Sequence, residues 1–183
     1  MSGSVGDNTA RASGVIASAG GGAVLQVKSV QLTSTVSVGS SGTPVAITAF
    51  DIAFTPTAAN SVLCLQLSME VSSDSAGVGG YFYDSTGAAK IQPYADTASS
   101  RQRLTYLGCV HDTHLTAPLT FTAWFTPGDA TTRTIQVWGA AQASASLYIN
   151  RSEADGDYAT INYARSASTF TITEYDGSIV TIA

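Results

Sequence analysis

Charged side chains are scarce in this chain of 183 residues. They make up 11% of it, whereas an average soluble protein carries about 25%. The eight Lys and Arg residues are scattered from Arg11 to Arg165, and the formal net charge is −5. Proteins that bind nucleic acid need clustered cations to neutralise phosphates, so we expect no nucleic-acid partner. Abundant Ser and Thr must cover the solvated faces instead.

Long apolar runs are missing too. Nothing reaches the roughly 18 consecutive apolar residues that a membrane-spanning helix needs, and the first residues lack the basic-then-apolar order of a signal peptide. We therefore expect no membrane partner and no export. Under those conditions the two cysteines, Cys64 and Cys109, stay reduced, and we predict two buried free thiols in preference to a disulfide.

A sustained helical period is absent as well. Apolar residues alternate with polar ones instead, which is typical of strands with one buried face. Turn-forming segments rich in Gly, Pro, Asp and Asn recur at short intervals. This spacing predicts an all-β fold, an antiparallel, jelly-roll-like β-sandwich of about eight to ten strands. The predicted buried sets are Leu63, Leu65, Leu67, Met69 and Val71; Leu119, Phe121, Ala123 and Phe125; Ile135 and Val137; Phe170 and Ile172.

The chain divides into two unequal parts. Residues 1–23 consist mainly of Gly, Ser and Ala, with too few sizeable apolar groups to form a core. We interpret them as an extended N-terminal arm and residues 24–183 as the β-sandwich domain. Early in that domain the apolar residues change phase, which predicts a bulge or bend near Lys28 and Ser29.

Familiar catalytic patterns are absent. The sequence contains neither a GxSxG nucleophile elbow nor a glycine-rich phosphate-binding loop. A carboxylate pair of the glycosidase type would have to come from distant strands, and no local pattern indicates one. We therefore predict a protein that is not an enzyme, with no catalytic residues and no cofactor.

Two segments offer metal-ligand side chains. Cys109, His111 and His114 lie close together, but a closed zinc site needs four ligands and the usual zinc spacings are absent. The acidic residues of 153–157 offer oxygens, yet calcium takes about six to eight of them, and the segment departs from the calcium-loop pattern. An exposed loop and a solvated acidic turn are the better interpretations, so we expect no bound metal.

A cluster of tyrosines is the main candidate for binding. Tyr81 and Tyr83 share one face of a predicted strand, with Asp84 beside them and Tyr94 further along. Tyrosine beside carboxylates is a common way to hold sugars or protein partners, so these four residues form the predicted contact set. The alternative, which we favour at this point, is that the rings pack inside the sandwich or at a subunit interface.

Two stretches resemble a known family. Residues 52–65, IAFTPTAANSVLCL, are similar to an "ITPTSASNxLLI" segment of β-sandwich domains in tail fibres and related virion proteins of tailed bacteriophages. Residues 148–175 begin with YINRS, continue through two aspartates and an arginine, and end with STFTITEY. They resemble the closing "INRS…D…R..S.ITI.E" pattern of the same domains.

This resemblance implies a non-enzymatic structural protein of a phage virion, assembled in the host cytoplasm and commonly a homotrimer. Residues 1–23 would attach it to capsid or tail proteins. The sandwich would act as a short tail-fibre knob that binds a host receptor, for example a surface glycan. The alternatives are a capsid decoration protein that stabilises the head and a carbohydrate-binding module.

The charged residues of the closing pattern are predicted to fix its shape. We expect Arg151 to pair with nearby carboxylates and Arg165 to pair with Glu174 across a hairpin, because paired arginines hold a turn where charges are otherwise rare. We interpret these residues as structural in preference to receptor contacts. The set comprises Asn150, Arg151, Asp155, Asp157, Arg165 and Glu174.

Overall fold

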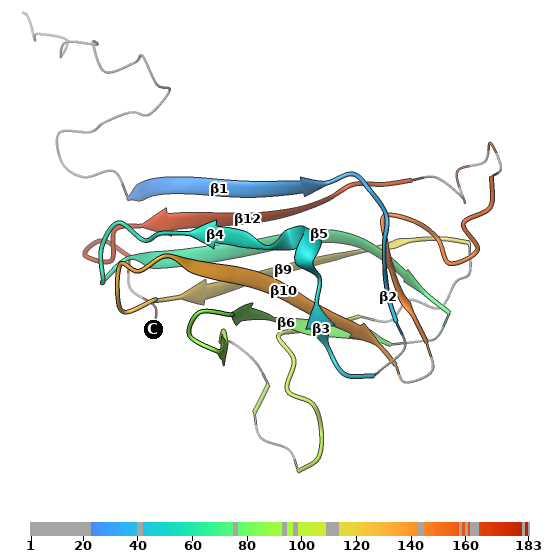
Figure 1. The fold of residues 1–183 in the computed structure, drawn as a ribbon, viewed down its shortest axis with the longest axis horizontal. Coiled ribbons are helices and arrows are strands. Elements are labelled where there is room, and N and C mark those ends of the chain that lie inside the picture. Colours follow the sequence, from blue (N-terminus) through green and yellow to red (C-terminus); the bar gives the residue numbers. More distant parts are fainter. Residues whose placement is uncertain are drawn as a thin grey trace, which may run out of the picture.

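Two antiparallel β-sheets pack face to face in the computed structural model (Figure 1). This confirms the predicted all-β sandwich. Within the described residues the regular elements are twelve strands and one 3-10 helix, η2 (Thr48–Phe50). The structure describes residues 23–39, 42–74, 77–92, 95–96, 99–108, 114–142, 145–157, 159, 161, 165–180 and 182.

Sheet A contains six strands: β1 (Val24–Leu32), β2 (Val36–Val38), β5 (Val62–Ser73), β9 (Ala117–Phe125), β11 (Leu147–Ile149) and β12 (Ser168–Tyr175). The long strand β5 lies in the middle. β12 and β11 follow each other along one edge of β5, and β9 pairs along its other edge. β1 lies beyond β12, and β2 lies beyond β11.

Sheet B contains β3 (Val45–Ala46), β4 (Ile52–Phe54), β6 (Val78–Asp84), β7 (Ala89–Lys90), β8 (Tyr106–Gly108) and β10 (Arg133–Ala141). β10 lies in the middle, with β6 along one edge and with β4 and β3 in succession along the other. β7 and β8 pair with the outer edge of β6. Six of the twelve strands have only two or three residues. Such short strands leave no alternation in the sequence, which is why fewer strands were predicted.

The core lies between the sheets and contains the predicted apolar sets. All five residues predicted for β5 are at most 1% exposed, and those of β10 and β12 are fully buried. Phe82 of sheet B stacks on Phe170 of sheet A with 5.5 Å between ring centroids. Tyr106 meets Phe121 of β9 at 4.9 Å. In β9 two of the four predicted residues are only half-buried, because this strand forms an edge of sheet A.

Two glycines make room for the buried ring of Tyr106. Its hydroxyl donates a hydrogen bond of 2.6 Å to the Trp138 carbonyl, across the inner face of β6. A Cβ atom on Gly80 would lie 2.3 Å from that hydroxyl, and one on Gly139 would lie 3.2 Å from it. Burial raises the pKa of Tyr106 well above its usual range. Glycine is therefore required at 80 by a close approach of side chain to backbone.

The predicted bulge near Lys28 and Ser29 is wrong. β1 pairs continuously with β12 from Gln26 to Leu32, and its irregularity lies between Val24 and Gln26. The change of phase in the sequence has another cause: apolar residues occur on both faces of this edge strand. The apolar side chains at the start of β1 are exposed, whereas that of Leu32 at its end is buried.

Residues 1–22 of the predicted arm lie outside the described part of the chain. Ala23, the last residue of the arm, is the first residue that the structure describes. The chain enters the sandwich through β1, at one end of sheet A (Figure 1). In the part of the chain that the structure describes, no helix is long and apolar enough to cross a bilayer.

Candidate binding surface on sheet B

Three aromatic rings form a row on the outer face of sheet B. Tyr81 lies opposite Trp138, and Tyr83 follows two residues later on the same face. The centroids of Tyr81 and Trp138 are 5.6 Å apart with nearly parallel planes, and those of Tyr83 and Trp138 are 4.7 Å apart. Tyr81 is only 6% exposed, whereas the other two rings are partly exposed. We call these three residues the aromatic row.

Polar side chains hold the aromatic row in place. Gln136 accepts a hydrogen bond from Trp138 Nε1 at 3.0 Å and donates one to Asp51 Oδ2 at 2.9 Å. The Lys90 ammonium lies 4.1 Å from the ring centroid of Tyr81, a cation–π distance. Partly exposed rings bordered by an amide, a carboxylate and a cation form a surface that suits a polar ligand with apolar faces.

Asp84 does not belong to this surface, which corrects the predicted contact set. Strand alternation turns it inward, and it is 2% exposed. It forms a buried ion pair with Arg133 and accepts hydrogen bonds from the backbone N–H groups of Thr86 and Gly87 at 3.0 and 3.1 Å. A buried carboxylate needs such partners, so Asp84 fixes the turn after β6. Tyr94 lies outside the described residues.

The same arginine anchors a second carboxylate. Arg133 pairs with Asp129 at 2.7 Å. Hydrogen bonds from Thr131 and Arg133 lower the pKa of Asp129 to about 2. The turn before β10 is thereby tied to the start of that strand.

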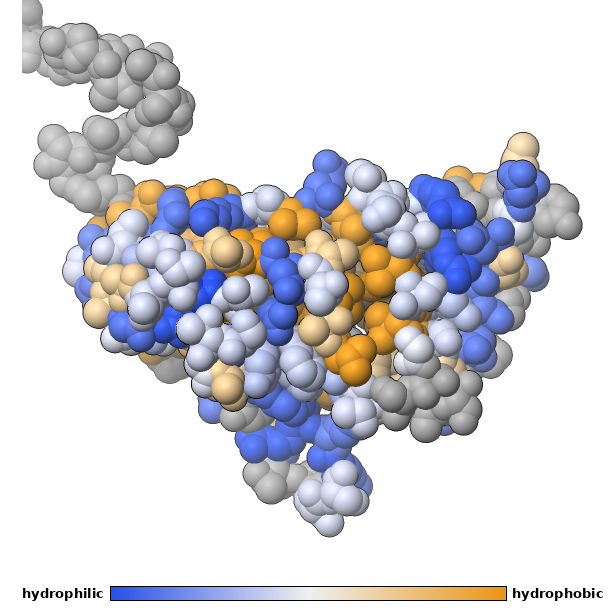
Figure 2. All heavy atoms as spheres, viewed as in Figure 1, coloured by the Kyte–Doolittle hydropathy of each residue, from blue (hydrophilic) through white to orange (hydrophobic). Residues whose placement is uncertain are grey.

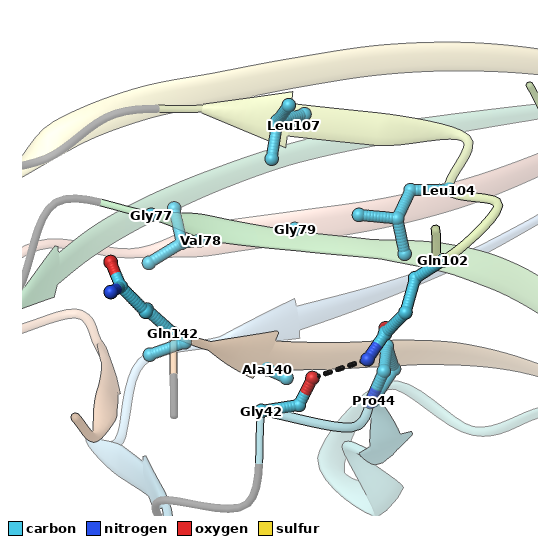
Figure 3. A pocket seen from close by; sticks show the side chains of 11 residues that line it. Gly42, Pro44, Gly77, Val78, Gly79, Gln102, Leu104, Leu107, Ala140 and Gln142 are labelled. Carbon is cyan, nitrogen blue, oxygen red and sulfur yellow. Dashed lines mark hydrogen bonds between the residues drawn. The ribbon is translucent and has the colours of Figure 1, made fainter. Parts of the chain in front are cut away.

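A pocket of about 260 Å³ lies between the ends of β6 and β10 and the segments that precede β3 and β8 (Figure 3). Small residues of β6 and β10 line it, including Gly79 and Ala140. Each is two residues from the aromatic row on its own strand, Gly79 from Tyr81 and Ala140 from Trp138. Alternate residues share a face, but Tyr81 and Ala140 are buried and Leu104 covers Gly79, so the pocket is separate from the exposed rings of Tyr83 and Trp138. We call this hollow the sheet B pocket.

The closing pattern of the sequence forms a hydrogen-bond network at one end of the sandwich, centred on Asn150. Its Nδ2 donates to the carbonyl oxygens of Leu32 and Ser34 at 2.7 and 2.9 Å. Its Oδ1 accepts from Ser168 Oγ, which in turn accepts from the backbone N–H of Glu70. Asn150 has a φ of 61°, a conformation that asparagine adopts more readily than most residues. One buried side chain thus joins β1, β5, β11 and β12.

The arginines of this pattern pair with one aspartate. Asp155 lies 2.8 Å from Arg165 and 3.5 Å from Arg151. Arg151 also donates to Ser37 Oγ at 3.1 Å, and its guanidinium lies 4.2 Å from the ring centroid of Tyr148. These contacts hold the loop after β11 against β2.

The predicted pair of Arg165 and Glu174 is wrong. Arg165 pairs with Asp155 instead, and Glu174 is fully buried at the far end of β12. Glu174 accepts hydrogen bonds from Gln26 Nε2 and from the N–H and hydroxyl of Thr57, at 2.6 to 2.7 Å. Burial alone would raise the pKa of Glu174, but these hydrogen bonds and one from Ser61 outweigh burial and lower it. Asp157 is exposed.

Metal ligation finds no support in the described part of the chain, where no group of three or more His, Cys, Asp or Glu side chains is placed to hold an ion. Cys109 and His111 lie outside the described residues. Cys64 is a free, buried thiol, and burial raises its pKa. It lies on the outer face of sheet A, opposite Trp124.

An apolar patch occupies the end of sheet A where the chain enters. Val24, Leu25, Val27 and Trp124 are 47%, 40%, 56% and 38% exposed. Figure 2 shows part of the patch as a hydrophobic area over the start of β1. Val27 and Trp124 belong to one row of paired residues across β1, β12, β5 and β9. Contiguous exposed apolar groups of this kind are typical of contact surfaces. We call these four residues the β1 patch.

Sequence reasoning missed part of the binding surface. Gln136 and Lys90 gave no local signal, because they reach the aromatic row only through strand pairing. The sheet B pocket escaped notice for another reason: its glycines resemble turn residues in the sequence. Strand alternation alone, however, could have shown that Asp84 faces away from Tyr83.

Comparison with known proteins yields little. No model of a known protein family matches the chain, and no curated protein matches it. Among solved structures, it is similar to a mutant VP2 protein of infectious bursal disease virus, from derived T=1 particles. The TM-score is 0.36 and the sequence identity 12%, over 81% of this chain and 36% of that one. The chain therefore spans about a third of that protein, and a likeness of this degree carries no inference about function.

Proposed function

We propose that this protein is a non-enzymatic structural component of a bacteriophage virion, displayed at the particle surface by its β-sandwich and attached through residues 1–23. The observation that carries the proposal is the resemblance of residues 52–65 and 148–175 to phage virion β-sandwich domains. The geometry of Asn150 supports it, because that residue joins four strands, as expected of a pattern that defines a fold.

The use of buried carboxylates also supports a structural role. Asp84 is engaged by Arg133 and by a backbone turn, and Glu174 by four donors on two other segments. Both therefore serve the scaffold. Neither is poised as an acid or base facing solvent.

Homotrimeric assembly is part of the proposal, since the resembled domains are commonly trimers. The β1 patch supports it because it offers an uncharged contact surface, with 38 to 56% exposure of each residue. Light scattering on the purified chain tests this point. A mass of three chains supports the trimer, and a monomer at all concentrations contradicts it.

The experiment for attachment compares the full chain with a variant that lacks residues 2–22. Both carry the same C-terminal tag and are produced during infection by the encoding phage. We expect the shortened chain to fold, because the contacts described above lie within residues 23–182, and to be absent from purified particles. Equal incorporation of both chains would contradict attachment through the arm.

A second candidate function is carbohydrate binding by the same domain. The observation that favours it is the partly exposed pair of Tyr83 and Trp138 beside Gln136, Asp51 and Lys90. A host-cell adsorption assay with Tyr83→Ala tests the surface, and unchanged adsorption removes it as a receptor contact.

A further inference from the structure

We propose that the open edge of β9 binds the β9 strand of a second copy of the chain, so that sheet A continues from one molecule into the next. This contact goes beyond the proposed function. It is a pairing of strand edges, whereas the proposed trimer uses exposed apolar side chains. Three features of β9 carry it: one edge is open, the strand has no charge, and its sequence is complementary to itself in antiparallel orientation.

β9 leaves one edge of its backbone unpaired. Its nine residues pair with β5 on one side, and the described residues form no other backbone hydrogen bond with it. The N–H and C=O groups along the other side are therefore available to another strand. Phe121 and Phe125 are half-buried for the same reason, because no further strand covers that side of their rings.

The opposite edge of the sheet is protected, in contrast to β9. β1 and β9 are the outermost of the four long strands of sheet A (Figure 1). On β1, Lys28 Nζ donates to the Ala53 carbonyl and Gln26 Nε2 donates to the Thr55 carbonyl, each at 2.7 Å. These bonds tie the edge to β4, and an edge lysine discourages pairing with another chain. β9 has no charged residue, and its one proline, Pro118, lies next to its start.

The charge of the protein favours a second copy at this edge. Each chain carries a formal net charge of −5, so two copies repel each other unless they meet where neither is charged. β9 provides such a surface. The β5 residues beside positions 120–124 on the outer face are uncharged as well: Ser68, Gln66 and Cys64. A strongly charged partner would find no group of opposite charge along this stretch.

The inner face of β9 is complementary to itself. All nine residues pair with those of a second β9 when the two-fold axis passes through Phe121, and any other antiparallel register leaves ends unpaired. In this register each larger side chain lies opposite an alanine: Leu119 opposite Ala123, and Phe125 opposite Ala117. Paired residues point to the same side of a sheet, so the cores of the two copies join across the contact.

The outer face of β9 suits the same register. Thr120 lies opposite Thr122 of the second copy, and pairs of threonines stabilise antiparallel strands. Pro118 lies opposite Trp124 of the second copy, which sets an apolar ring beside the indole. Trp124 is 38% exposed in the single chain. The pairing therefore covers an aromatic ring and the open backbone together, in an isologous contact between identical surfaces.

Analytical ultracentrifugation of the full-length chain, from about 1 μM to 1 mM, measures the contact. We expect the mass to double with concentration, from one chain to two, or from three to six if the β1 patch holds a trimer. A mass that stays at three chains would contradict this inference and leave the trimer intact. A mass of two chains would support this inference and contradict the trimer. A single chain at every concentration would contradict both.

Charges on the outer face test the register. Thr120→Lys combined with Thr122→Lys sets like charges opposite each other and should weaken the doubling at least about tenfold. Thr120→Lys combined with Thr122→Glu sets opposite charges against each other and should restore it. The control, Gln66→Lys, adds a lysine at an exposed position of the same face, one strand inward, and should change nothing. Melting temperatures near that of the parent show that each variant is folded.

Two results with the variants would overturn the pairing of β9 with itself. Undiminished association of the variant with two lysines would assign the contact between copies to another surface. Failure of the variant with lysine and glutamate to restore association would exclude the antiparallel register centred on Phe121. Neither result bears on incorporation into particles, which tests the virion role separately.

Discussion

A few buried polar residues connect the strands of the sandwich by side-chain hydrogen bonds. Asn150 is the clearest, because its side chain satisfies two backbone carbonyls that β1 leaves at its end. The sequence indicated a structural role for this residue through the YINRS motif, but the two carbonyls that it binds lie more than a hundred residues away. Only strand register brings them together, which is why Arg165 was paired with the wrong carboxylate.

Replacement of Asn150 should therefore be costly. Asn150→Ala leaves the Leu32 and Ser34 carbonyls unpaired and should lower the free energy of unfolding by about 2–4 kcal/mol. Asn150→Gly loses the same bonds, but glycine adopts a φ of 61° without strain. This variant should therefore be about 1 kcal/mol more stable than Asn150→Ala. Urea unfolding measures both. If Asn150→Gly is as stable as the parent protein, the hydrogen bonds contribute nothing.

Glu174 predicts a dependence of stability on pH. Its pKa is lower in the folded chain than in the unfolded chain. Its contribution is therefore complete above the unfolded value of about 4.3 and is lost as the pH falls through the folded value. Glu174→Gln should be less stable at pH 7 by about 1–3 kcal/mol, and the gap to the parent should close towards pH 3.

Chemical denaturation of both proteins at several pH values checks this. Asp129 and Asp176, whose pKa values are also lowered, are common to the two proteins and cancel in the comparison. A gap that stays constant from pH 7 to pH 3 would contradict the role of the Glu174 charge.

At the scale of elements, alternation in the sequence predicted the long strands and their buried faces. It could not predict β2, β3, β7 or the other short strands, whose two or three residues show no period. Nor could it separate the two faces of β1, because both carry apolar side chains. The binding surface was half predicted: Tyr81 and Tyr83 were found through alternation, while Trp138 joins them only through the pairing of β6 with β10.

The pairing of β6 with β10 depends on Gly80. Gly80→Ala would put a Cβ atom 1.8 Å from the Trp138 carbonyl and 2.3 Å from the Tyr106 hydroxyl. Such overpacking typically costs about 1–3 kcal/mol, and more where backbone must shift, so we expect poor folding or a melting temperature at least several degrees lower. Gly39→Ala, which meets nothing within 4 Å, is the matched control. Equal melting temperatures for both variants would show that the close approach is absent in solution.

At the scale of the whole molecule, the two outer faces differ in character. Most of the outer face of sheet A is covered by hydroxyl and amide side chains, for example Ser29, Thr171, Gln66 and Thr122 in one paired row. Its apolar end, the β1 patch, lies where the chain enters. Sheet B carries the aromatic row and the sheet B pocket. This division suits a protein that is attached at one end and presents a recognition surface on another face.

The copy number of the chain in purified particles tests the virion role most directly. Quantitative mass spectrometry of particles from the encoding phage measures it against a capsid protein of known number. The account predicts a fixed, reproducible ratio: a few dozen copies or fewer for a tail fibre, or hundreds for a decoration protein. Its absence from particles, with abundant chain in the infected cell, would contradict the central claim.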